Sequence, residues 1–281
     1  MANANNFAYK GANSDYSDKF DLFVVKASGG LAVQGDLDDP ESAEGLGIGA
    51  AVTVGVNLDV LPVDKIGPID LSKMDLFVSF MSYNIDQDFD DTNIEGDLSH
   101  FAVSGRYQIV DGVEFIPGSM LKWGGVFLHT GFQKSSSKIT AIQSIADDNI
   151  SVGAGAGAYI TNTTASFDIE ASTLSVPIEV STYIRAAYVF TLFGGAGFDI
   201  VNGTSDASLN AGGTVSGTGA TSTYAATVSA NESDSGEADV TNMRVFGGMQ
   251  FNLPLFRVYA QMNSGIGNDL IGLNVGAKIL W

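Results

Sequence analysis

Cysteine is absent from this chain of 281 residues, and long hydrophobic runs are absent as well. Without cysteine the protein has no disulfide framework and no thiolate to act as a nucleophile or a metal ligand. No window approaches the ~18 consecutive apolar residues that a membrane-spanning helix requires. The sequence therefore excludes helical membrane spans, although 45% of its residues are hydrophobic.

Positively charged residues are also scarce. The chain contains 13 Lys and Arg against 32 Asp and Glu, which gives a net charge of −19. Such a protein would repel a phosphate backbone, so nucleic acid is excluded as a partner. The opening residues, MANANNF, have neither the basic region nor the apolar core of a signal peptide. We expect them to begin a mature secreted protein to which an initiator methionine has been added.

What the sequence has instead is alternation of apolar and polar residues, which is the period of a β-strand. In residues 46–58 (LGIGAAVTVGVNL), one face would carry Leu, Ile, Ala and Val, and the other mainly Gly, Ala, Thr and Asn. Similar patterns predict ten strands, over residues 20–34, 45–58, 74–84, 98–109, 120–133, 174–190, 193–203, 241–252, 256–264 and 270–281. A bulge is expected at Gly124-Gly125, where alternation fails. No segment predicts an amphipathic helix.

The length and polarity of these strands favour a membrane barrel over a soluble sandwich. Sandwich strands are usually ~5–6 residues long with charged outer faces, whereas these approach the ~9–11 residues that cross a bilayer at a tilt. Their polar faces hold Gly, Ser, Thr, Asn and Gln with isolated charges, as expected of a lumen. Backbone amides in hydrocarbon must be paired, so the strands must close into a ring. The predicted fold is an all-β, antiparallel up-and-down transmembrane barrel of about ten strands.

The connections between the strands alternate in length. Short or proline-bearing links such as 253–255 alternate with long polar ones, and this alternation is typical of outer-membrane barrels. We therefore divide the chain into an N-terminal periplasmic segment, 1–19, and a single barrel, 20–281, with long extracellular loops at 134–173 and 204–240. Both termini are then expected in the periplasm. Alternatively, the polar segment 1–19 enters the lumen.

Alternating runs within the long loops leave the strand number open at twelve or fourteen. These runs are ISVGAGAGAYI (150–160) and STYAATVSA (222–230). Their alternate positions hold mainly Ala, Gly, Ser and Thr, which anchor poorly in lipid. We expect them to be strand extensions above the membrane rather than further spanning pairs.

The chain ends in GLNVGAKILW, in which apolar residues alternate up to Trp281. This ending resembles the C-terminal assembly signal of bacterial outer-membrane β-barrel proteins. The resemblance implies that Trp281 belongs to a signal read by the barrel-assembly machinery. It also implies a bacterial outer-membrane location, with outer-membrane lipid and lipopolysaccharide as surrounding partners. The motif identifies no subfamily.

Six basic residues are expected on the inward faces of the strands. They are Arg106, Lys122, Arg185, Arg244, Arg257 and Lys278. Charged residues around a narrow lumen set ion selectivity, so these six are candidate selectivity residues, and small inward residues such as Gly47 and Gly49 would leave room for a pore. The alternative is that inward carboxylates such as Asp75 and Asp199 pair with the cations and brace a closed barrel.

Two further motifs raise the question of other chemistry. His100 and His129 are the only imidazoles, and a barrel hydrolase using either is a third alternative. His100 and Ser104 share a face but are separated by ~13 Å along one strand, too far for a nucleophile–base pair. The carboxylates of Asp86, Asp88 and Asp90 can converge on a divalent cation. However, the run lacks the glycine of an EF-hand, so we expect a solvated loop with at most loosely bound Ca²⁺.

These observations predict a porin-like outer-membrane channel that passes ions or small polar solutes passively, without a cofactor. The alternative is a non-conducting structural barrel that acts through its extracellular loops. Enzymatic activity is not expected. The sequence leaves the choice between a monomer and an oligomer open.

Overall fold

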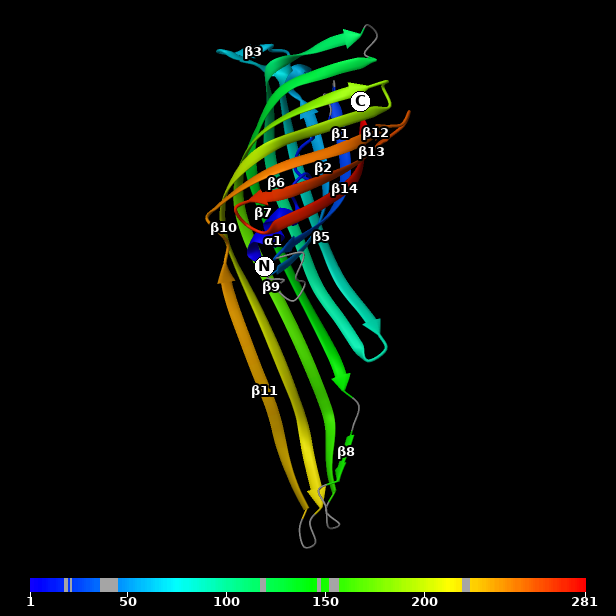
Figure 1. Ribbon diagram of the computed structural model, residues 1–281, viewed down its shortest axis with the longest axis vertical. Helices are drawn as coiled ribbons and strands as arrows, with labels where there is room; N and C mark the ends of the chain where they lie inside the picture. The colour runs from blue at the N-terminus through cyan, green and yellow to red at the C-terminus, as the bar shows by residue number, and fades with distance from the viewer. Residues whose placement is uncertain are drawn as a thin grey trace.

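The computed structural model describes residues 1–17, 20, 22–35, 45–116, 120–145, 148–151, 157–218 and 223–281. Ten strands form a closed antiparallel ring in sequence order, which closes because β9 pairs with β10 as well as with β7 (Figure 1). The ring strands are β1 (Phe23–Gln34), β2 (Gly45–Asn57), β5 (Met74–Phe89), β6 (Thr92–Ile116), β7 (Leu121–Ile145), β9 (Gly157–Ala186), β10 (Phe190–Thr218), β12 (Thr241–Asn252), β13 (Arg257–Ile266) and β14 (Leu270–Leu280). The expected ten-stranded barrel is confirmed.

The remaining elements lie outside the ring or within it. Two strands, β8 (Asp148–Ser151) and β11 (Thr223–Glu237), pair only with β9 and β10 respectively. The link from β2 to β5 contains two short 3₁₀ helices and a two-stranded hairpin: η2 (Leu58–Val60), β3 (Lys65–Ile66), β4 (Ile69–Asp70) and η3 (Leu71–Lys73). One helix, α1 (Ala2–Ala8), lies in the lumen. None of the helices in the described part of the chain is both long and apolar enough to cross a membrane.

Side chains alternate between the lumen and the outer surface, as the sequence predicts. Val54 and Val78 point outward and are 42% and 43% exposed, whereas their neighbours Thr53 and Ser79 point inward and are 1% and 0% exposed. Apolar side chains outside and polar side chains inside are typical of a barrel that is surrounded by lipid. The expected bulge is confirmed by a register shift after Trp123 and by the positive φ of Gly125.

Strands β5, β6, β7, β9 and β10 continue past the ring, and β11 joins them at one edge, so an open sheet projects from one mouth (Figure 1). We call this sheet the extension.

The expected loops at 134–173 and 204–240 are largely strands, since β9 and β10 stay paired out to Gly157 and Thr218. Of the run 222–230, residues 223–230 belong to β11, which lies outside the ring, so this described part is a strand extension, as expected. The run 150–160 falls partly outside the described residues. Polar sequence was mistaken for loop because Ser and Thr continue a strand once it is in water.

Polarity inverts where the strands enter the extension. On the outward face of β9, the exposed apolar residue Leu174 is followed toward the tip by Ser172 and Glu170. On the inward face the change is opposite, from Thr173 to Ile169. The pairing with β10 has no register shift between these positions, so the pleat is continuous and only the residue types change. A change from lipid to water around the sheet would produce this inversion, and on this basis we expect the membrane boundary near Leu174.

Candidate functional site

The lumen is occupied by residues 1–17, which we call the N-terminal plug. Every plug residue from Ala2 to Ser17 is buried. Asn3 hydrogen-bonds to Asp239, at the mouth that carries the extension, through its amide nitrogen at 2.9 Å. The other end of the plug reaches β14, where Asp15 bonds to Lys278. The expectation of a periplasmic segment 1–19 is therefore wrong over its described part, and the alternative that this segment enters the lumen is confirmed there.

The two ends of the chain lie at different mouths. The backbone of Met1 packs against Gly45, the first residue of β2, next to the extension. Trp281 bonds through its backbone to Leu22 and Phe23 at the start of β1, at the mouth with the short turns. The expectation that both termini lie at the mouth with the short turns therefore fails for Met1.

Helix α1 fits against inward glycines of β1 and β2. A Cβ at Gly30 would lie 1.9 Å from the carbonyl oxygen of Ala8, and one at Gly47 would lie 2.1 Å from that of Ala4. Only glycine allows the helix to approach so closely. The small inward residues were expected to leave room for a pore, but they make room for the plug. The helix was not predicted because protein surrounds it on all sides, so it needs no amphipathic pattern.

The last turns of the plug gather cations from three strands, and we call this group the Asp15 cluster. Lys278 Nζ lies 2.6 Å from both carboxylate oxygens of Asp15. Arg106 donates to the backbone carbonyl of Asp15 and forms a 2.6 Å ion pair with Asp75. Lys26 Nζ donates to plug carbonyls, including that of Gly11 at 2.8 Å. These groups are buried, and removing one partner of a buried ion pair typically costs ~3–5 kcal/mol.

A second network ties the middle of the plug to the opposite wall. Lys10 Nζ donates to Asp199 at 3.0 Å, and Arg244 Nε donates to the other oxygen of the same carboxylate at 3.3 Å. Arg244 also forms an ion pair with Glu179, which accepts a 2.6 Å hydrogen bond from the Tyr16 hydroxyl. Two barrel carboxylates thus hold one barrel cation and two plug side chains together.

Three of the six predicted inward cations, Arg106, Arg244 and Lys278, are buried in these two networks. Arg106 pairs with Asp75 and Arg244 with Asp199. The alternative of cations that brace the barrel is therefore confirmed for these two arginines. Their role in ion selectivity stays a prediction.

The other three predicted cations, Lys122, Arg185 and Arg257, lie half-buried at the mouth with the short turns. Lys122 is directly opposite Arg185 across β7 and β9. Deeper in the barrel, two cavities between plug and wall have volumes of about 20 and 10 Å³. A cavity of that size holds about one water molecule.

Both histidines are covered by the plug. His100 Nε2 lies 2.7 Å from the Asn13 amide oxygen, while the Ser104 hydroxyl donates to the Asn13 backbone carbonyl at 2.5 Å. His129 Nδ1 lies 2.8 Å from the Ser14 hydroxyl. A hydrolytic substrate would reach either ring only after the plug has moved.

The residues predicted as a loose calcium loop form the tip of a hairpin. Asp86 and Asp88 lie on β5, and the turn follows at Asp90, whose φ is +48°. The Asp88 carboxylate accepts a 2.7 Å bond from the Asn93 amide. Within the residues that the structure describes, no three His, Cys, Asp or Glu side chains are grouped so as to hold a metal ion. Loose calcium binding here stays a prediction.

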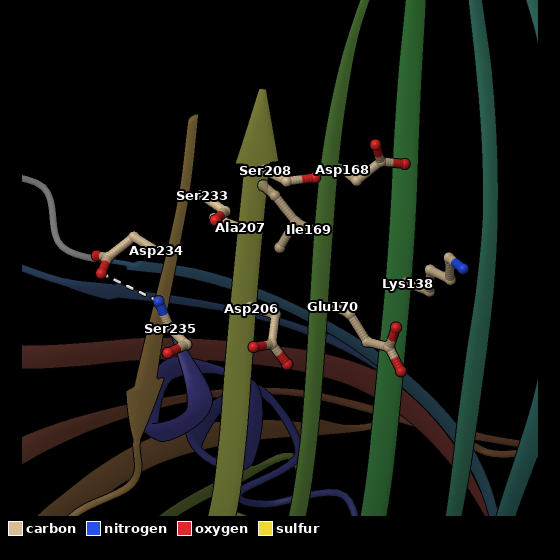
Figure 2. Close-up of a pocket in the computed structure, with 10 residues that line it drawn as sticks. All are labelled: Lys138, Asp168, Ile169, Glu170, Asp206, Ala207, Ser208, Ser233, Asp234 and Ser235. Atoms are coloured by element: carbon tan, nitrogen blue, oxygen red, sulfur yellow. Dashed lines mark hydrogen bonds between the residues drawn. The ribbon is translucent and has the colours of Figure 1, made fainter. Parts of the chain in front are cut away.

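The outward face of the extension has an open hollow of about 370 Å³ (Figure 2). Lys138, Glu170 and Asp206 lie in one row across β7, β9 and β10. Asp168 lies two residues from Glu170 on the same face, and β11 borders the hollow with Ser233 and its neighbours. The hollow therefore carries mainly negative charge.

The sequence as a whole matches a family model described as Lsa36-like, over residues 1–281. The chain belongs to the Lsa36-like family. No curated protein matches it.

Solved structures similar to this Lsa36-like barrel are distant. The translocator domain of the autotransporter NalP from Neisseria meningitidis has 10% identity and a TM-score of 0.39, with 99% of this chain and 93% of that chain covered. The outer membrane protease OmpT from Escherichia coli has 10% identity and a TM-score of 0.39, with 95% and 100% covered. The toluene transporter TbuX from Ralstonia pickettii has 6% identity and a TM-score of 0.30, with 94% and 90% covered. The barrel assignment rests on the closed ring of strands.

The sequence reasoning missed the plug residues that complete the networks: Lys10, Asp15 and Tyr16. The signal that could have found Asp15, though neither Lys10 nor Tyr16, is an imbalance of inward charge. Seven basic residues fall within predicted strands, and few inward carboxylates are available to form ion pairs with them. A buried cation without a partner is too costly to persist, so an anion had to come from outside the ring.

Proposed function

We propose that this Lsa36-like protein is a closed barrel of the bacterial outer membrane that displays its extension as a binding surface. The observation that supports a closed lumen is the plug, which is buried from Ala2 to Ser17 and joined to the wall by ion pairs. The extension supports display, because strands this long are not needed to span a bilayer. This proposal favours the non-conducting alternative over the porin-like channel.

We further propose that the extension is extracellular and that Trp281 lies at the periplasmic mouth. In outer-membrane barrels the short turns are periplasmic and the long elements extracellular. Lipid and lipopolysaccharide then surround the outward faces, and the barrel-assembly machinery reads the C-terminal strand. The barrel works without a cofactor, and neither histidine has a catalytic role.

Because the chain has no cysteine, single cysteines test this proposal without background. Ser229 lies on exposed β11, Ser14 in the buried plug, and Leu255 in an exposed short turn. A membrane-impermeant maleimide should label Ser229→Cys on intact cells and Leu255→Cys only after the outer membrane is opened. Ser14→Cys should react only after unfolding. Rapid labelling of Ser14→Cys in the folded barrel would contradict a closed lumen, and labelling of Leu255→Cys on intact cells would reverse the orientation.

A second candidate function is a channel that conducts when the plug leaves. The observation that favours it is the Asp15 cluster, in which a plug carboxylate neutralises cations of the wall. Withdrawal of Asp15 would leave Lys26 and Lys278 uncompensated in the lumen, which would favour anions. Anion selectivity that falls when Arg257 and Lys278 are neutralised together would support this function. Its absence in an unplugged barrel would exclude it.

A further inference from the structure

Strand β11 has one backbone edge that pairs with no other strand in the described part of the chain. It pairs with β10 over all 15 of its residues, from Thr204↔Glu237 to Thr218↔Thr223. β11 is the last strand at this edge of the sheet. Every residue from Ala225 to Glu237 is exposed. A long row of amide and carbonyl groups therefore faces water along this edge of the extension, and Figure 1 shows β11 at the edge of the sheet that projects from the barrel mouth.

This edge lacks most of the devices that protect a sheet edge, and its carboxylates are the exception. Natural sheets blunt their edges with proline, lysine, bulges or very short strands. β11, TYAATVSANESDSGE, contains no proline and no Lys or Arg, and its register with β10 has no shift. Such an edge is suited to strand addition, in which an extended peptide adds to a sheet through main-chain hydrogen bonds.

The side chains beside the edge select the charge of an added strand. Glu232 and Asp234 alternate on one face of β11, and Glu237 lies on the other face, diagonal to Asp206 of β10. Figure 2 shows Asp206 and Asp234 on these two neighbouring strands. Directly opposed side chains of paired strands lie ~4.5–5.5 Å apart, where opposite charges stabilise the pair and like charges destabilise it. An added strand with Lys or Arg at alternate positions would thus be favoured.

We propose that β11 binds an extended basic segment of a partner protein by strand addition, with alternate Lys or Arg residues beside Glu232 and Asp234. A second copy of this chain fits this edge poorly, because two β11 strands would bring their carboxylates together and each chain carries a net charge of −19. The inference rests on the proposed function, since it names the partner class of the displayed extension.

The test uses the full chain, refolded in detergent micelles, and a fluorescent peptide of the same 15-residue length as β11. In this peptide Lys alternates with Val or Thr. It should bind with a saturable rise in anisotropy and should slow amide exchange within β11. A peptide in which proline replaces each Val or Thr keeps the charge but loses main-chain donors, so it should bind at least about tenfold more weakly. Equal binding of both peptides, or no binding of either, would overturn the proposal.

Two matched charge reversals locate the site. Glu232→Lys with Asp234→Lys should weaken binding of the Lys peptide by about tenfold or more, because two attractive cross-strand pairs become repulsive. Asp86→Lys with Asp88→Lys makes the same change of charge on β5, at the other edge of the extension, and should alter binding less than about twofold. Equal losses in the two variants would show attraction to net charge alone and refute strand addition at β11.

A pair of proline variants separates loss of binding from loss of fold. Thr227 and Val228 are neighbours in β11, so their amides point to opposite edges and only one of them bonds to β10. In one of the two variants, Thr227→Pro or Val228→Pro, the amides of β10 should stay protected from exchange, because the lost amide faced the free edge. That variant should still lose peptide binding. Unchanged binding in that variant would contradict the proposal. A barrel that binds no peptide but stays closed refutes this inference alone, whereas an open full-length barrel refutes the proposed function alone.

Discussion

Replacing Asp15 by asparagine should loosen the plug. The substitution keeps the shape of the side chain but removes the charge that faces Lys278 at 2.6 Å. Lys26 and Arg106 bond to the plug backbone in the same cluster, so three barrel cations would share a buried site with less negative charge. The state with the plug inside the barrel should become less stable relative to a state in which water enters the lumen.

The size of the effect follows from the burial of the pair. Asp15 and Lys278 are 3% and 2% exposed. Removing one partner of a buried ion pair costs ~3–5 kcal/mol, and every ~1.4 kcal/mol is a factor of ten in an equilibrium constant. Since asparagine still accepts a hydrogen bond from Lys278, we expect the lower end, a roughly 10²-fold rise in the plug-out population.

The assay is the rate at which Ser14→Cys reacts with a maleimide in the folded barrel, with and without Asp15→Asn. The matched control is Asp111→Asn, which breaks the 2.7 Å pair with Lys73 near the mouth with the short turns. That hydrogen bond raises the pKa of Lys73, but Asp111 is 69% exposed. Water screens an exposed pair, so it adds little to stability. The control should therefore leave the labelling rate unchanged.

The reasoning would be refuted if Asp15→Asn left the labelling rate of Ser14→Cys at the level of the control. The Asp15 cluster would then not hold the plug. A rise of similar size in both variants would point to general loosening of the barrel instead.

Three further predictions concern the plug, the membrane boundary and assembly. Gly47→Ala should displace α1 and speed Ser14→Cys labelling, whereas Gly29→Ala, whose Cβ would meet nothing closer than 3.9 Å, should not. Val103→Arg lies two residues on the lipid side of the boundary, so its cost in denaturant unfolding from lipid vesicles should fall between the ~0–1 kcal/mol of an interface and the ~2–4 kcal/mol of the midplane. Ser99→Arg, four residues nearer the tip on the same outward face, should cost ~0–1 kcal/mol; equal costs would misplace the boundary. Deleting Trp281 should slow insertion by the barrel-assembly machinery and leave refolding in detergent unchanged, and unchanged insertion would remove the residue from the assembly signal.

Much of the barrel could be predicted because a strand between lipid and lumen has a strong local pattern. All ten ring strands were found, since outward residues such as Val54 and inward ones such as Thr53 alternate over a full membrane crossing. The extension was misjudged because the pattern weakens in water, where Ser172 and Glu170 replace the apolar outward residues. The alternation of apolar outward and polar inward residues, which identifies a strand in lipid, does not continue beyond Leu174.

The sealed lumen could be offered only as an alternative, because it depends on contacts between distant parts of the chain. The sequence places Arg244 and Asp199 on inward faces, so their pairing could be offered as an alternative. Nothing local shows that Lys10 would share Asp199 with Arg244, since 189 residues separate Lys10 from that carboxylate. Residues 1–17 also lack a hydrophobic pattern, because a helix enclosed by a polar lumen needs none.

The central claim, a barrel sealed by its own N-terminal plug, is tested most directly by single-channel conductance in a planar bilayer. The full chain is compared with a variant that lacks residues 1–17, in a salt gradient that reports selectivity. We predict silence from the inserted full-length barrel and discrete, anion-selective steps from the truncated one. Steps of equal size and frequency from both proteins would contradict the claim.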